Sequence, residues 1–109
     1  MPPRAIFGFM HSKDRFKNQS SLLAAAEGFR KGNYPIDTIV QDWYFWPATP
    51  QTGFINHGFD PARYPDPPKM TSQLHEWNMH FMVTYWPQVD GPLQAQLNAT
   101  TPPALIGGV

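Results

Sequence analysis

Residues 36–46, with the sequence IDTIVQDWYFW, decide how this chain can fold. The stretch contains a short apolar run rich in β-branched residues, 38–40, which is typical of a buried strand. One carboxylate follows, that of Asp42, and aromatic rings lie close behind it, among them those of Trp43, Tyr44 and Trp46. Such rings can stack on the faces of pyranose sugars, and a carboxylate accepts hydrogen bonds from sugar hydroxyls. The pattern therefore fits a sugar pocket, and it also fits a strand end that Asp42 caps above a core that the rings fill.

The composition limits the classes of partner. The chain has 109 residues, which suits one small domain, and its eight basic and eight acidic residues leave no excess positive charge for nucleic acid. No apolar run approaches the length that crosses a membrane. Cysteine is absent, and the four histidines do not have the spacing of a metal-binding motif. We expect no nucleic-acid or membrane partner, no metal and no cofactor, while the compartment stays open.

A strand, a helix and a second strand are expected in the first half of the chain. The apolar residues 5–10 predict the first strand. Ser20 or Ser21 can cap the helix, and Gly32 is expected as the left-handed residue at its end. The apolar stripe of this helix consists of Leu22, Ala26 and Phe29. Residues 37–43 predict the second strand, which carries Asp42 at its end.

The second half predicts a further helix and strand. Residues 46–64 form a long connection with several prolines and glycines, which we interpret as an ordered lid. Asp66 is expected to cap a helix that ends at Asn78. Its apolar stripe consists of Met70, Leu74 and Trp77. Residues 80–86 predict a third strand, and we expect the tail, 88–109, to be poorly ordered. The order βαβαβ implies an α/β fold with three parallel strands and two helices.

Four sequence motifs together resemble glycoside hydrolase family 31, which contains α-glucosidases and α-xylosidases. They are PPRAIFGFMHSKDRF at 2–16, YPIDTIVQDWYFW at 34–46, FDPARYPDP at 59–67 and FMVTYWP at 81–87. Each motif is weak alone, but the four occur in order and at sensible spacing. The QDW at the end of the second strand is most similar to the α-xylosidase side of the family. The resemblance covers about four-fifths of the chain.

The resemblance implies a fold and a set of binding residues. The family's catalytic domain is a (β/α)₈ TIM barrel with its active site at the carboxyl ends of the strands, so residues 1–87 would form the first three strands of a partial barrel. By resemblance, Asp42 hydrogen-bonds the sugar in the cleavage subsite, Trp43 shapes the pocket and Trp86 lines it, while Tyr44 is a further candidate. Met10 and His11, expected at the end of the first strand, could also face the site. The implied ligand is an α-linked sugar or oligosaccharide.

The chain also departs from the family pattern. Retaining α-glycosidases need two carboxyl groups about 5–5.5 Å apart, and in this family both come from segments beyond the third strand. We find neither segment, so we assign no catalytic residue and expect a truncated piece that is inactive alone, with the remainder of the barrel as its possible partner. An alternative is a non-catalytic carbohydrate-binding or interaction module, for which the tail, 88–109, would fold over the open sheet.

Overall fold

The structure, a computed structural model, describes residues 1–47 and 58–84, together with Ala95 and Ala99. The chain forms two compact units, of which the first comprises Met1–Phe45 and Phe59–Tyr85. Every helix and strand described below belongs to this first unit. Most of the expected lid and nearly all of the expected tail lie outside the described residues.

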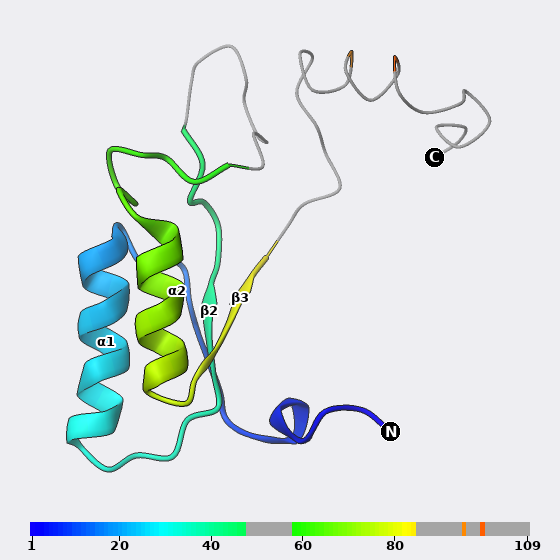
Figure 1. Cartoon of the computed structure of the whole chain (residues 1–109), viewed down its shortest axis with the longest axis vertical. Helices are drawn as coiled ribbons and strands as arrows, with labels where there is room; N and C mark the ends of the chain where they lie inside the picture. Colours follow the sequence, from blue (N-terminus) through cyan, green and yellow to red (C-terminus); the bar gives the residue numbers. More distant parts are fainter. Residues whose placement is uncertain (48–57, 85–94, 96–98, 100–109) are drawn as a thin grey trace. The chain divides into compact units, whose positions relative to one another are not determined.

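The first unit contains a three-stranded parallel sheet and two α-helices (Figure 1). In chain order the elements are the 3₁₀ helix η1 (Arg4–Phe7), β1 (Met10–Lys13), α1 (Gln19–Lys31), β2 (Thr38–Gln41), α2 (Pro67–Glu76) and β3 (His80–Val83). The strand order is β1-β2-β3, and both strand pairs are parallel. The predicted βαβαβ order, with three parallel strands and two helices, is thus confirmed.

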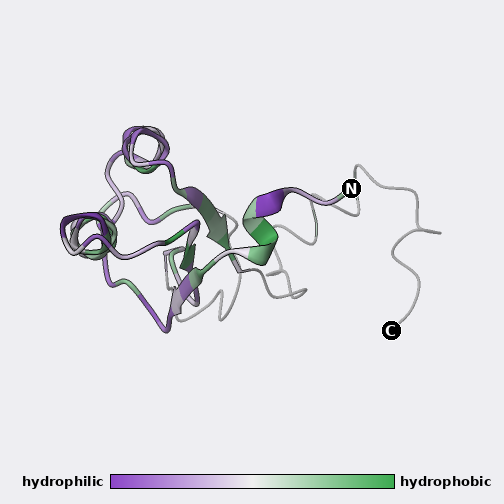
Figure 2. Cartoon of the chain, turned by 90° about the horizontal axis from the view of Figure 1, so that it is seen from below, coloured by the Kyte–Doolittle hydropathy of each residue, from purple (hydrophilic) through white to green (hydrophobic). Residues whose placement is uncertain are grey.

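Both helices cover the same face of the sheet, as the end-on view in Figure 2 shows. The register places His11, Ile39 and Phe81 in one row across the three strands. The ring centroid of His11 lies 4.9 Å from that of Phe29 on α1, so this row faces the helices. Because side chains alternate along a strand, the neighbouring rows point away from the helices. One of those rows contains Ser12, Val40 and Met82.

The first strand does not lie where the apolar pattern predicted it. Residues 5–10 were expected to be the strand, but η1 occupies Arg4–Phe7 and β1 occupies Met10–Lys13. The carbonyl of Phe9 accepts hydrogen bonds from the N–H groups of Asp37 and Thr38, which sets where pairing with β2 begins. Phe7 is 79% exposed, so the apolar residues before the strand are not buried in the described structure. The prediction failed because hydrogen-bond register, and not apolar content, defines this edge strand.

The start of α1 also differs from the prediction. Its N-cap is Asn18 rather than Ser20 or Ser21. The side chain of Asn18 accepts a hydrogen bond from the Ser21 N–H at 2.9 Å, and the Ser21 hydroxyl accepts one from the Asn18 N–H at 3.2 Å. This reciprocal pair satisfies two backbone donors that the first turn of a helix leaves unpaired.

Both helices end in the same way, with an asparagine in the left-handed conformation. Asn33 has a φ of 56° after α1, and Asn78 has a φ of 53° after α2. The residue after each asparagine is Tyr34 or Met79, and its N–H donates a hydrogen bond to the carbonyl five residues earlier, as in a Schellman motif. The expectation that Gly32 would be the left-handed residue is wrong, because its φ is −81°.

The start of α2 was predicted correctly, whereas the two later strands are shorter than expected. Asp66 is the N-cap of α2, and its carboxylate accepts a hydrogen bond from the Lys69 N–H at 2.9 Å. β2 spans Thr38–Gln41 rather than 37–43, and β3 is assigned to His80–Val83 rather than 80–86, of which 85 and 86 lie outside the described residues. Asp42, expected at the end of the second strand, nevertheless follows β2 directly.

The core lies between the sheet and the helices. Leu22 and Ala26 of α1 and Met70 and Leu74 of α2 are fully buried. β2 is buried along its whole length. On the face away from the helices, Met10 and Met82 of the outer strands are 37% and 44% exposed. The two outer strands therefore present apolar side chains that no described element covers.

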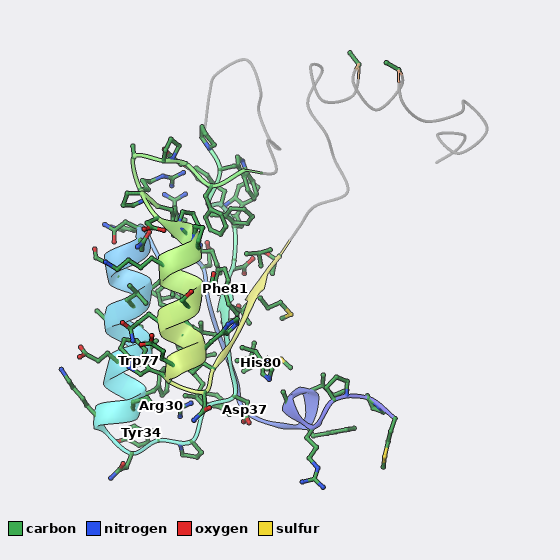
Figure 3. The ribbon with its side chains drawn as sticks, in the orientation of Figure 1. Arg30, Tyr34, Asp37, Trp77, His80 and Phe81 are labelled. Atoms are coloured by element: carbon green, nitrogen blue, oxygen red, sulfur yellow. The ribbon has the colours of Figure 1, made fainter. Side chains whose placement is uncertain are left out.

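Arg30 ties the lower ends of the helices to the start of β2 (Figure 3). Its Nε donates to the carbonyl of Trp77 at 2.7 Å, and its Nη2 donates to the carbonyls of Ile36 at 2.9 Å and Asn78 at 3.0 Å. A guanidinium suits this place because it carries several donors in a fixed plane. One side chain of α1 thus satisfies three carbonyls of the segments that enter β2 and leave α2.

Candidate functional site

Asp42 lies directly after β2, where the parallel strands end. Its Oδ1 accepts a hydrogen bond from the backbone N–H of Trp43 at 2.8 Å and another from the hydroxyl of Thr84 at 2.6 Å. These two hydrogen bonds fix the side chain. Asp42 is partly exposed, so its carboxylate remains accessible. A fixed, accessible carboxylate at this position can accept hydrogen bonds from a ligand's hydroxyl groups.

Thr84 reaches Asp42 because the ladder between β2 and β3 continues past the last assigned pair. Gln41 is the register partner of Val83, and the Thr84 N–H donates to the Gln41 carbonyl at 3.1 Å. Thr84 therefore lies beside Asp42, one step further along both strands. The row before it on the same face holds Val40 and Met82, so Asp42 and Thr84 point away from the helices.

On the opposite face, Gln41 anchors the backbone that carries Asp42. Gln41 is fully buried, and its Nε2 donates to the carbonyl of Asp42 at 2.7 Å. Its Oε1 lies 2.9 Å from the hydroxyl of Tyr64, which also donates to the carbonyl of Phe16 at 2.6 Å. Burial raises the pKa of Tyr64 to about 12, so the phenol is neutral and serves as a donor. The network joins the segments that follow β1 and β2 to the turn before α2.

The aromatic residues after Asp42 have different surroundings. The rings of Trp43 and Tyr44 meet edge to face, with centroids 5.8 Å apart. Tyr44 also contacts two guanidinium groups, those of Arg15 at 4.0 Å and Arg63 at 4.8 Å from its ring centroid. Such cation–π contacts fix the orientation of the ring. Tyr44 is thus held between arginines, while Trp43 lies nearer to Asp42 in the chain.

Trp43 lines an open groove of about 570 Å³ together with the segment that follows β1 and one side of α1. The lining residues are Lys13, Asp14, Arg15, Phe16, Lys17, Asn18, Ser21, Ala25 and Trp43. Three of them are basic and one, Asp14, is acidic, so the groove has a net positive lining beside the tryptophan.

Asp60 takes part in the turn that carries Tyr64 rather than in the neighbourhood of Asp42. Its carboxylate accepts a hydrogen bond from Arg63 Nε at 2.7 Å and another from the Ala62 N–H at 3.0 Å. The hydrogen bond from Arg63 is the main reason that the pKa of Asp60 is lowered. The carboxylate therefore stays charged and stabilises the turn.

The structure brings some of the predicted site residues together and separates others. Asp42, Trp43 and Tyr44 are consecutive and lie at the carboxyl end of β2. Trp86 lies outside the described residues. Met10 and His11 begin β1 instead of ending it, and His11 packs against α1, so the expectation that His11 faces the site is wrong.

Sequence reasoning missed Thr84, Gln41 and Tyr64. Thr84 could have been identified from the sequence, because it is a polar residue near the end of the third strand. When the second and third strands are aligned by their carboxyl ends, Thr84 lies beside Asp42. Gln41 and Tyr64 have no such signal. Their roles arise from a contact across 23 residues, between the end of β2 and the turn before α2.

Neither a metal site nor a membrane-spanning helix is found where the structure describes the chain. Among residues 1–47 and 58–84, no group of three or more histidine, aspartate or glutamate side chains could hold a metal ion. Within the same ranges, no helix combines the length and the apolar character needed to cross a membrane.

Comparison with known proteins places the chain in a family. Residues 1–102 match the model of the glycosyl hydrolases family 31 TIM-barrel domain, which extends beyond the motifs quoted above. The chain belongs to glycoside hydrolase family 31. Its sheet of three parallel strands with two helices on one face agrees with the first part of such a barrel, in which active sites lie at the carboxyl ends of the strands.

Relatives within family 31 include α-xylosidases. The chain is 29% identical over 85 residues to an α-xylosidase of Saccharolobus solfataricus, covering 78% of this chain and 11% of that protein. It is 32% identical over 102 residues to an uncharacterised family 31 glucosidase of Pseudescherichia vulneris, covering 89% of this chain and 18% of that protein. A family 31 α-xylosidase from a soil metagenome, solved in complex with xylose, superposes with a TM-score of 0.79 at 29% identity, covering 92% of this chain and 14% of that chain. The chain therefore spans less than a fifth of these relatives.

Proposed function

We propose that these 109 residues hold the sugar in the cleavage subsite of an α-glycosidase that hydrolyses O-glycosyl bonds with retention of configuration. Asp42 carries this proposal, because its accessible carboxylate is fixed at the carboxyl end of β2 by Thr84 and by the Trp43 N–H. Two relatives support the α-xylosidase or α-glucosidase type, one named as an α-xylosidase and one as a glucosidase. A matched α-xylosidase was solved with xylose, which supports a neutral pyranose as the ligand.

Each proposed binding residue has a separate role. Asp42 accepts hydrogen bonds from sugar hydroxyls. Trp43, the next residue in the chain, lines the groove along α1, to which Asp42 does not contribute. By the family resemblance, its ring shapes the pocket and favours the sugar that fits it. Tyr44 is a weaker candidate, since its ring already contacts Arg15 and Arg63. Trp86 keeps its proposed place at the end of the third strand on the basis of the family resemblance.

The proposal includes binding without cleavage by the 109 residues alone. A retaining glycosidase needs a nucleophile and a general acid/base about 5–5.5 Å apart. By resemblance, both acids come from segments beyond the third strand, and the 109 residues contain no match to those segments. Residues 1–87 would provide the barrel part and 88–109 an irregular tail. The complete active site would then require the remainder of a barrel.

Binding and turnover of p-nitrophenyl α-xyloside by the purified chain test this proposal. We expect saturable binding, measured by ligand-observed NMR, and no release of p-nitrophenol. Asp42→Asn should weaken binding about tenfold or more, because a hydrogen bond to a charged group contributes about 1.5–3 kcal/mol. Glu76→Gln is the matched control, since it removes the same charge at the exposed end of α2 and should leave binding unchanged.

Two results would contradict the proposal in different ways. Absence of binding by a folded chain would contradict the proposed sugar site. Release of p-nitrophenol that disappears in the Asp42→Asn variant would show that the 109 residues are catalytically competent, and the missing acids would then have to be sought within them. The α-glucoside, measured in parallel, separates the α-xylosidase type from the α-glucosidase type.

A further inference from the structure

We propose that Thr84 is a positioning residue that occupies one oxygen of Asp42 and leaves the other to the ligand. This inference deepens the proposed function and rests on it. In this arrangement the residue after β2 supplies the binding carboxylate, and the residue after β3 supplies the hydroxyl that sets its orientation. This arrangement predicts that the ligand is a neutral sugar whose hydroxyl groups donate hydrogen bonds to a single carboxylate oxygen.

The backbone brings Thr84 to this position. Its N–H bonds to the Gln41 carbonyl at 3.1 Å, which extends the ladder of β2 and β3 to the row of Asp42. In a parallel sheet, side chains in one row point to the same face. The Thr84 hydroxyl, directly after β3, therefore meets the Asp42 carboxylate, directly after β2.

The two bonds saturate Oδ1 of Asp42. The distance from Thr84 Oγ1 is 2.6 Å, within the range of charge-assisted O–H···O⁻ hydrogen bonds, and the Trp43 N–H lies 2.8 Å away on the same oxygen. A carboxylate oxygen has two lone pairs, so Oδ1 has no acceptor capacity left. Within the described part of the chain, both hydrogen bonds of the Asp42 side chain end on Oδ1, which leaves Oδ2 as its open acceptor.

This geometry restricts the chemistry of the ligand. Oδ2 can accept hydrogen bonds from one or two hydroxyl groups, but Asp42 cannot bind a diol with one hydroxyl on each carboxylate oxygen. A ligand with a carboxylate or phosphate at the same point would be repelled, since Asp42 presents only a charged acceptor. The Thr84 hydroxyl itself is committed to Oδ1 and donates nothing to the sugar.

Exchange of the Thr84 side chain separates positioning from a purely structural contribution. Thr84→Val removes the hydroxyl at nearly constant shape, and Thr84→Ser retains it. Thr71→Val is the matched control, because it removes a threonine hydroxyl that bonds the Pro67 carbonyl at 2.9 Å within α2. Each variant is prepared as the full 109-residue chain, with and without Asp42→Asn.

The first readout needs no sugar. The amide proton of Trp43 bonds to Oδ1, so its chemical shift reports how the carboxylate is oriented. We expect Thr84→Val to move this signal, and Thr84→Ser and Thr71→Val to leave it close to its position in the parent chain. An unmoved Trp43 signal in Thr84→Val would overturn the positioning role, whatever the chain binds.

The second readout is affinity for p-nitrophenyl α-xyloside. We expect Thr84→Val to weaken binding about tenfold and Thr84→Ser to restore it, since one charge-assisted bond orients the carboxylate. In the Asp42→Asn background, Thr84→Val should add little, because residues that act through one group are not additive. Equal losses in both backgrounds would overturn the inference. A parent chain that binds no xyloside, yet shows the expected Trp43 shifts, would contradict the proposed function and leave the Thr84–Asp42 coupling supported.

Discussion

The hydroxyl of Tyr64 lies in the core and serves two segments. It donates to the Phe16 carbonyl at 2.6 Å and lies 2.9 Å from Gln41 Oε1. Because burial disfavours the phenolate, the pKa of Tyr64 rises from 10.0 to about 12. A pKa raised by folding means that the contribution of Tyr64 to stability is fully present below pH 10 and is lost as the pH rises through 12.

Alkaline titration checks this shift. Phenolate absorbance should show a late phase from Tyr64, about two pH units above an ordinary tyrosine. Over the same interval, the free energy of unfolding should fall by at most about 2.7 kcal/mol. Tyr64→Phe should remove the late phase, and Tyr34→Phe, at a residue 63% exposed, should leave it. A late phase that survives in Tyr64→Phe would show that another tyrosine is responsible.

At the scale of secondary-structure elements, Arg30 holds the two helices and β2 together. Three carbonyls, from Ile36, Trp77 and Asn78, accept its hydrogen bonds. Figure 3 shows Arg30 beside Trp77 and Asp37, where the helices end and β2 begins. Without the guanidinium, the partly buried carbonyls of Ile36 and Trp77 would lose this donor, and so would the exposed carbonyl of Asn78.

We therefore expect Arg30→Met, which keeps the apolar stem, to lower the free energy of unfolding by about 2 kcal/mol or more. Arg30→Lys should recover only part of the loss, because one ammonium group cannot reproduce the planar arrangement of donors. Lys31→Met is the control, since Lys31 makes an exposed pair with Glu27 that contributes less than about 0.5 kcal/mol. Chemical denaturation gives the values. Equal losses in Arg30→Met and Lys31→Met would refute the special role of Arg30.

The elements differ in how far the sequence predicts them. The helices were recognised because their apolar stripes repeat with helical spacing, and Leu22, Ala26, Met70 and Leu74 are buried as that spacing implies. The first strand was misplaced, because β1 is an edge strand whose residues are mostly polar or exposed, and its pairing depends on β2. Periodicity reports burial, whereas the limits of a strand are set by a partner far along the chain.

The residues of the candidate site also differ in how far the sequence predicts them. Asp42 was found from sequence because it directly follows an apolar strand. Gln41 and Tyr64 were not found, because their bond joins distant segments. Thr84 lies between these cases, since its place beside Asp42 follows once two strands are aligned. The sequence thus indicates the carboxylate that we propose as the ligand contact, but it does not indicate the residues that hold this carboxylate in place.

At the scale of the whole molecule, the sheet has two outer strands and, as far as the structure describes the chain, one face without helices. β1 and β3 are each paired on one side only within the described residues. Met10 and Met82 are exposed on the face away from the helices. In a complete barrel, parallel strands are buried on both faces and have no free edges.

Exposed apolar side chains beside an unpaired strand edge favour association between copies. We expect the 109-residue chain to form oligomers whose sedimentation depends on concentration. Met82→Lys should shift this equilibrium toward the monomer, because a charged side chain at an outer strand opposes both apolar contact and edge pairing. Ser72→Lys adds the same charge at an exposed position of α2 and should leave association unchanged. If the parent chain sediments as a monomer at all concentrations, its helix-free face must already be covered within one copy, which would favour the self-contained carbohydrate-binding module over a partial barrel.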